Sequence, residues 1–88
     1  MDIQFDPCKN ISNQAKHGVS LEWASQFERS SAVTWVDDQN VYGEIRFVAL
    51  GYIGLRLYVL VYTVRQSCCR IISLRKANRR EVALYAQT

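Results

Sequence analysis

An apolar stretch from Phe47 to Val64 limits the possible folds of this chain more than any other feature. Gly51, Gly54 and Arg56 interrupt it, so its apolar runs reach only about half of the ~20 residues that a membrane-spanning helix needs. Two strands joined by a turn fit this pattern better than one helix. The second of these strands, residues 56–64, is apolar on both faces, which is typical of a central strand that is covered on two sides.

The part of the chain before residue 32 predicts one short strand and two helices. Ile3 and Phe5 alternate with polar residues, as in a strand with one buried face. Asp6 is a good N-cap for a first helix, and Gly18 supplies its left-handed end. Ser20 is then placed to cap a second helix.

From residue 32 onward the apolar period changes to two, and β-branched and aromatic residues become frequent. This pattern predicts four strands, at residues 32–38, 44–52, 56–64 and 69–76. The turns between them, the first at residues 38–43, are short, so neighbouring strands should be mostly antiparallel. Asn78 and Glu81 have the spacing of a capping box at the start of a last helix.

The length and the order of these elements predict one domain over residues 1–88, since a chain of 88 residues can build one compact core but not two. The expected fold class is α+β. It has a short N-terminal strand, two helices, a four-stranded mostly antiparallel sheet and a C-terminal helix.

Charge is distributed unevenly along the chain. Residues 1–44 hold three cations and seven acids, whereas residues 45–88 hold eight cations and one acid. The net charge of +3 therefore hides a strongly basic C-terminal half. Such a half is suited to binding a polyanion, and nucleic acid is the polyanion that fits best.

Other kinds of site find little support in the sequence. Three cysteines form no paired disulfide framework, and a single histidine without a CxxC pair cannot supply a recognisable zinc site. The N-terminus, MDIQFDP, lacks the basic and apolar segments of a secretory signal. We therefore expect a cytoplasmic protein that uses no metal and no cofactor and does not bind membranes.

The densest basic segment begins at Arg70 and holds five cations before the first acid, Glu81. The five are Arg70, Arg75, Lys76, Arg79 and Arg80. Strand alternation predicts that Arg75 shares a face with Ser73, while Arg70, Leu74 and Lys76 point to the opposite face.

The last two arginines of this segment occupy the first turn of the predicted C-terminal helix, where the helix dipole disfavours cations. Free backbone N–H groups and guanidinium forks at such a position are suited to binding a phosphate. The alternative is a solvated basic edge that discourages the sheet from pairing with other chains.

RNA can be cleaved without a metal if a base removes the proton of the 2′-hydroxyl and cations stabilise the phosphorane. The chain has the cations, and His17 is its only conventional base near neutral pH. Glu81 is the carboxylate nearest to the arginines in the sequence. His17 can equally serve the end of its helix and Glu81 its cap, so these residues leave open a ribonuclease or a non-catalytic nucleic-acid-binding or regulatory subunit.

Two segments of the sequence resemble the BrnT family of bacterial type II toxins. They are FDPCKNISNQAKHGVSLEWA near the N-terminus and RIISLRKANRRE near the C-terminus, with Tyr85 four residues past Glu81. The resemblance implies a RelE-like α+β fold and a metal-independent endoribonuclease that inhibits translation. It also implies neutralisation by a BrnA-type antitoxin, whose DNA-binding part represses the shared operon.

The resemblance also implies roles for individual residues. The expected catalytic residues are Arg65, Arg75, Arg80, Glu81 and His17. Lys16 belongs with His17 to a second group that the resemblance implies, and we expect it to bind RNA. The charge of the basic segment itself, rather than the resemblance, adds Arg70, Lys76 and Arg79 as expected RNA-binding residues.

Overall fold

The computed structural model describes residues 2–37 and 43–88 and has an α+β fold, as the sequence predicts. Its elements in chain order are β1 (Asp2–Gln4), α1 (Pro7–His17), the 3₁₀ helix η1 (Leu21–Gln26), β2 (Val33–Val36), β3 (Phe47–Ile53), β4 (Arg56–Arg65), β5 (Cys68–Lys76) and α2 (Arg79–Ala86). The second predicted helix is thus a 3₁₀ helix. Most of the predicted turn at 38–43, and the last residue of the strand predicted at 32–38, lie outside the described residues.

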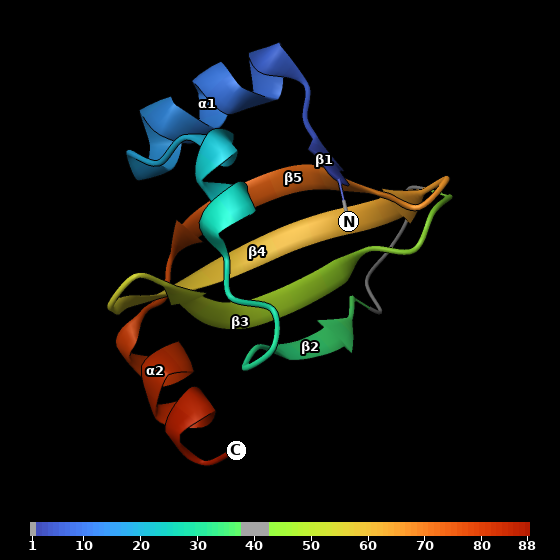
Figure 1. Cartoon of the computed structure of the whole chain (residues 1–88). Helices are drawn as coiled ribbons and strands as arrows, with labels where there is room; N and C mark the ends of the chain where they lie inside the picture. The colour runs from blue at the N-terminus through green and yellow to red at the C-terminus, as the bar shows by residue number, and fades with distance from the viewer. Residues whose placement is uncertain (1, 38–42) are drawn as a thin grey trace.

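The five strands form one mixed sheet in the order β1-β5-β4-β3-β2. β1 runs parallel to β5, and the other neighbouring strands are antiparallel. The predicted N-terminal strand therefore extends the four-stranded sheet at one edge. We call the face toward the viewer in Figure 1, which η1 crosses, the front face, and the opposite face the rear face.

Each face of the sheet has its own core. The front core is the larger one, and η1 contributes Leu21 and Ala24 to it. The rear core is small, built on Leu50, Leu57 and Val59. α2 packs on this rear core at the end of the sheet where the β3–β4 turn lies, so the described elements leave the remainder of the rear face without a helix (Figure 1).

A β-bulge in β5 changes which side chains share a face. Ser73 lies opposite Val61 and Ile71 lies opposite Tyr62, so Ile72 has no partner across the ladder. As a result Ile71 and Leu74 both enter the front core, although they are three residues apart.

The predicted alternation along residues 70–76 is therefore wrong on the N-terminal side of the bulge. Arg70 lies opposite Thr63 and Arg75 lies opposite Val59, and both positions belong to the rear face. The physical reason is that one extra residue shifts the strand's period of two by one position. Arg70 and Arg75 thus share a face instead of pointing apart.

α1 is attached to the edge of the sheet through Asn13, which is only 5% exposed. β1 pairs with β5 only as far as Arg70, so the edge of β5 beyond that point needs other partners. The Asn13 amide accepts from the backbone N–H of Leu74 at 3.2 Å and donates to its carbonyl at 2.8 Å. It also donates to the carbonyl of Val19 at 2.8 Å. One side chain therefore replaces a neighbouring strand and fixes α1 against β5.

In the part of the chain that the structure describes, no helix is both long enough and apolar enough to cross a membrane.

Candidate nucleic-acid interface

Cationic side chains from β4, from β5 and from the residue just before β3 lie on the rear face of the sheet. The ladder places Arg65, Arg70 and Arg75 there, and strand alternation from Val48 places Arg46 there too. We call these four arginines, together with Ser73, the rear basic face. Among the described residues no helix covers this surface. Arg65 is exposed there, and the other members of the rear basic face are partly exposed to solvent.

α1 adds more cations at the margin of this face. A pocket of about 300 Å³ lies between the helix and the sheet and is lined by Lys9, Ser12, Asn13, Lys16, His17, Arg46, Ile72 and Ser73. The Asn13 contacts with β5 set the position of the helix, and α1 carries Lys9, Lys16 and His17 into the same pocket as Ser73. The structure thus brings His17 and Lys16 next to the rear basic face.

Glu81 and Arg75 form a two-pronged ion pair. Arg75 Nη1 donates to Glu81 Oε1 at 2.8 Å, and Nη2 donates to Oε2 at 2.7 Å. Glu81 also completes the predicted capping box, because its Oε1 accepts from the Asn78 N–H at 2.9 Å and its own N–H donates to Asn78 Oδ1 at 2.9 Å. The carboxylate therefore links the start of α2 to a guanidinium on the sheet.

This pairing shifts the ionisation of both groups toward the charged form. The hydrogen bonds from Arg75 are the largest cause that lowers the pKa of Glu81, and the Asn78 N–H contributes in the same direction. The same contact raises the pKa of Arg75. A carboxylate held in this way is a weak proton acceptor, so its geometry suits it to orienting Arg75 rather than to acting as a base.

Arg65 and Arg70 lie beside a second hollow on the rear side, at the end of the sheet where β4 turns into β5. Gln4, Gln66 and Cys68 complete its lining. Arg65 also pairs with Glu44 at 2.8 Å, but its side chain remains 53% exposed. An exposed pair of this kind contributes little to stability and can exchange Glu44 for an anionic ligand.

The remaining predicted site residues are not all gathered at this surface. Lys76 lies opposite Tyr58, whose side chain belongs to the front core, so Lys76 projects to the other side from Arg75. Arg79 lines an open groove with Arg56 and Tyr52, between α2 and the β3–β4 turn. Arg80 is exposed on α2, where its charge helps to lower the pKa of Glu81.

Several residues at this surface were not identified from the sequence. Lys9 and Arg46 are isolated cations in the sequence, and only the packing of α1 and the sheet places them together. Thr63 is 1% exposed, and its hydroxyl has no hydrogen-bond partner among the described residues. Burying this hydroxyl without a hydrogen bond costs free energy, and a valine, which has the same shape, would avoid that cost.

Together these residues form a cationic surface that also carries the Ser73 hydroxyl and the His17 imidazole. Guanidinium and ammonium groups of this kind bind the phosphates of nucleic acids, with the guanidinium forks able to contact two oxygens at once. In the described ranges, 2–37 and 43–88, no three histidine, cysteine or carboxylate side chains are grouped as they are in metal sites.

The sequence was compared with curated proteins and with models of protein families. A search of curated proteins finds no match. The family model described as "Ribonuclease toxin, BrnT, of type II toxin-antitoxin system" matches residues 5–81 of the 88-residue chain. The match begins just before α1 and ends at the capping glutamate of α2, so it includes the whole rear basic face. The chain therefore belongs to the BrnT family of ribonuclease toxins of type II toxin–antitoxin systems.

Proposed function

We propose that the chain is a metal-independent endoribonuclease that cleaves RNA on the rear basic face and thereby inhibits translation. The observation that carries this proposal is the bulge in β5, which turns Arg70 to the same face as Arg75. α1 adds Lys16 and His17 at the margin of that face. Cations gathered in this way can take over the charge neutralisation that a metal performs in other nucleases.

In the proposed reaction, neutral His17 removes the proton of the 2′-hydroxyl, and the 2′-oxygen attacks the adjacent phosphorus. Arg75, oriented by Glu81, and Arg70 stabilise the negative charge of the phosphorane. The bond to the 5′-oxygen then breaks, and Lys16 supplies the proton to that leaving oxygen. The products are a 2′,3′-cyclic phosphate and a 5′-hydroxyl, and Lys16 and His17 exchange protons with water before the next turnover.

The other cations are proposed to hold the RNA on either side of the cleaved bond. Lys9 and Arg46 line the pocket that contains His17, and Arg65 lies beside Arg70 at the β4–β5 end. Arg80 stays a candidate contact from the start of α2. Each phosphate contact releases counterions, so RNA affinity should fall steeply as the salt concentration rises.

The decisive experiment incubates the purified full chain with RNA in EDTA. Cleavage should continue, and a single 2′-deoxy substitution at the cleaved position should stop it because the nucleophile is then absent. Cleavage that EDTA abolishes and Mg²⁺ restores would contradict metal independence. RNA binding without any cleavage would favour the alternative of a non-catalytic nucleic-acid-binding or regulatory subunit.

Substituting one arginine on the rear face and one on the front face of the sheet then tests which face cleaves RNA. Removal of one transition-state donor typically lowers a rate by ~10²–10³, so Arg75→Ala should do so. Arg29→Ala removes the same charge from the front side of the sheet and should leave the rate unchanged. If both variants lost the same factor in cleavage rate, only the net charge of the protein would matter, and the assignment of the active site to the rear basic face would be refuted.

We further propose that a BrnA-type antitoxin neutralises the toxin by covering the rear basic face with an acidic segment, and that the complex binds operator DNA through the antitoxin. The Arg79 groove lies apart from the pocket at His17, so Arg79→Glu separates two possibilities. Copurification with tagged antitoxin should survive Arg79→Glu if the antitoxin contacts only the rear basic face. Lost copurification with intact RNA cleavage would place the main contact in the groove at α2 instead.

A further inference from the structure

A cavity on the front face of the sheet is separate from the surface assigned to RNA. Its volume is about 240 Å³. The connection between η1 and β2 forms one side, and strands β3, β4 and β5 form the floor. Ala49, Leu60 and Cys69 belong to the front core, so the sheet itself divides this cavity from the rear basic face.

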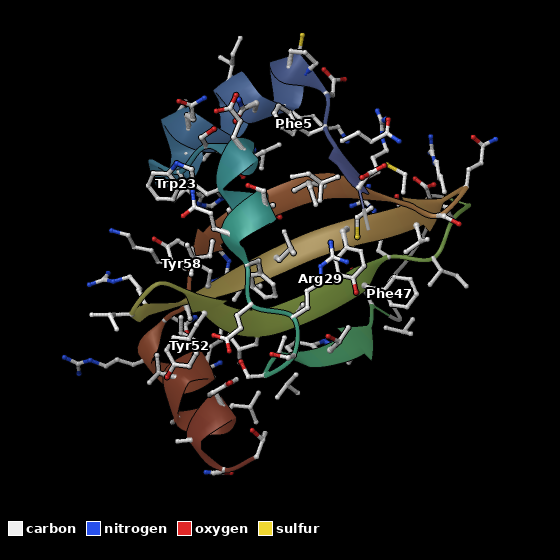
Figure 2. The ribbon with its side chains drawn as sticks, in the orientation of Figure 1. Phe5, Trp23, Arg29, Phe47, Tyr52 and Tyr58 are labelled. Carbon is white, nitrogen blue, oxygen red and sulfur yellow. The ribbon has the colours of Figure 1, made fainter. Side chains whose placement is uncertain are left out.

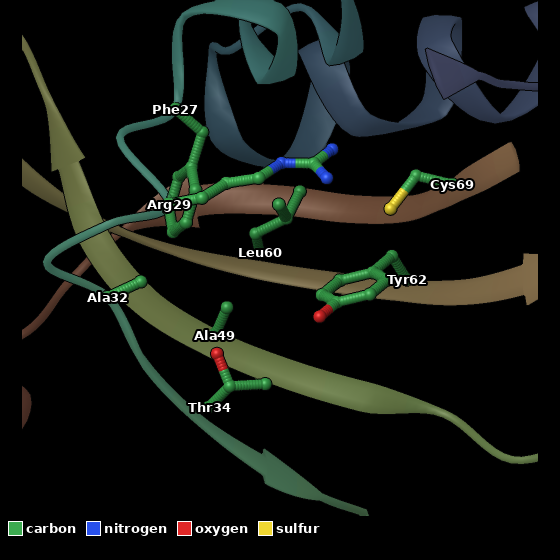
Figure 3. Close-up of a pocket in the computed structure, with 8 residues that line it drawn as sticks. All are labelled: Phe27, Arg29, Ala32, Thr34, Ala49, Leu60, Tyr62 and Cys69. Carbon is green, nitrogen blue, oxygen red and sulfur yellow. The ribbon is translucent and has the colours of Figure 1, made fainter. Parts of the chain in front are cut away.

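Three side chains that can donate hydrogen bonds, Arg29, Thr34 and Tyr62, line this cavity. Figure 3 shows the guanidinium of Arg29 extended over Leu60 toward Cys69, with the Tyr62 hydroxyl turned toward Ala49 and Thr34. Figure 2 shows Arg29 on the viewer's side of the sheet, between the η1–β2 connection and the strands.

Arg29 and Thr34 are exposed to solvent at the edge of this cavity, and Tyr62 is half-buried. Within residues 2–37 and 43–88, Arg29 forms no ion pair, and neither the Tyr62 nor the Thr34 hydroxyl forms a hydrogen bond to another side chain or to the backbone. Burial raises the pKa of Tyr62, so its hydroxyl keeps its proton and stays available as a donor. Apart from the charge interaction between Arg29 and Tyr62, the described residues therefore offer these three groups no partner.

The lining of the cavity limits what these groups can bind. Phe27, Ala49 and Leu60 supply apolar walls, which suit a ring or a short hydrocarbon body. One guanidinium with two neutral hydroxyls matches the charge and the two oxygens of a single carboxylate. Inorganic phosphate carries up to two charges and has no apolar part, so it fits this lining less well.

We propose that the front cavity binds a small aromatic carboxylate, with its carboxylate on Arg29, Thr34 and Tyr62 and its ring on the apolar wall. This inference does not depend on the ribonuclease proposal, because the two sites lie on opposite faces of the sheet.

The test uses benzoate as the probe, titrated into the full chain and followed by two-dimensional amide NMR. Saturable shifts should appear at Thr34, Ala49 and Leu60, and not at Ser73 on the rear face. Benzyl alcohol, acetate and inorganic phosphate should each bind at least roughly tenfold more weakly, because each lacks either the charge or the ring. Comparable binding of phosphate would overturn the assigned ligand class.

Variants assign the binding to the polar groups. Arg29→Gln keeps most of the side-chain length and should weaken benzoate binding roughly tenfold or more, because it removes a charge-assisted pair of hydrogen bonds. Thr34→Val should weaken binding by a smaller factor. Arg56→Gln, a matched loss of charge outside the cavity, should have no effect. Equal weakening by Arg29→Gln and Arg56→Gln, or no saturable binding of benzoate, would refute the proposal.

A protein could also supply a carboxylate, so the source needs its own measurement. The methylamide of N-acetylglutamate represents an acidic side chain of a bound protein and should not compete with benzoate. Displacement of benzoate by this peptide analogue at lower concentration than benzoate itself would show that the cavity prefers an acidic protein segment, and the proposal would fail.

Discussion

The ion pair between Arg75 and Glu81 gives the sharpest prediction, because it links the site to the pH dependence of stability. Glu81→Gln removes the negative charge, but the glutamine oxygen can still accept from the Asn78 N–H. The substitution therefore breaks the charge-assisted pairing with Arg75 and leaves the capping box largely in place.

The expected size of the effect follows from the exposure of the pair. Hydrogen bonds to charged groups contribute roughly 1.5–3 kcal/mol, whereas fully exposed ion pairs contribute about 0.2–1 kcal/mol. The side chains of Arg75 and Glu81 are 36% and 21% exposed, so the pair lies between these limits. We expect Glu81→Gln to lower the free energy of unfolding by about 1 kcal/mol at pH 7, after this discount for solvent screening.

The pH dependence has a definite sign. Because the folded state lowers the pKa of Glu81 from 4.5, its contribution is fully present above that value and is lost as the pH falls through the lowered pKa. Urea unfolding followed by circular dichroism should thus show a difference between wild type and Glu81→Gln at pH 7 that shrinks by pH 3. Asn78→Ala is the matched control, since the loss of a cap costs about 1 kcal/mol without a titrating group. A Glu81→Gln difference that is the same at both pH values would refute the reasoning.

Three further predictions concern single positions. Asn13→Ala should lower the free energy of unfolding by about 3 kcal/mol, because it leaves buried backbone groups of Leu74 and Val19 unsatisfied. A loss below about 1 kcal/mol in urea unfolding would mean that water replaces the amide. Ser67 has φ 66°, a left-handed conformation that is strained for serine but not for glycine. Ser67→Gly should therefore stabilise the fold by about 1 kcal/mol and raise the melting temperature, and an unchanged melting temperature would contradict this strain. Thr63→Val should raise stability by about 1 kcal/mol by removing an unsatisfied hydroxyl, and the reverse result would reveal a hidden hydrogen bond.

The fold was predictable to a large extent because its signals are local. The change of apolar period near residue 32, the caps at Asp6 and Ser20 and the capping box at Asn78 and Glu81 all depend on neighbouring residues, and the structure confirms each of them. The parallel pairing of β1 with β5 was not predictable in this way, because it joins the two ends of the chain.

The candidate site, like the fold, was predictable only where it depends on neighbouring residues. The sequence alone determined that the C-terminal half is basic and that Glu81 caps a helix beside several arginines. Only the tertiary structure decided which cations share a surface. One unpaired residue, Ile72, turns Arg70 to the face of Arg75, and one buried amide, Asn13, positions the helix that carries His17. Strand register and helix docking depend on contacts between residues distant in the sequence, so periodicity within a single strand cannot reveal them.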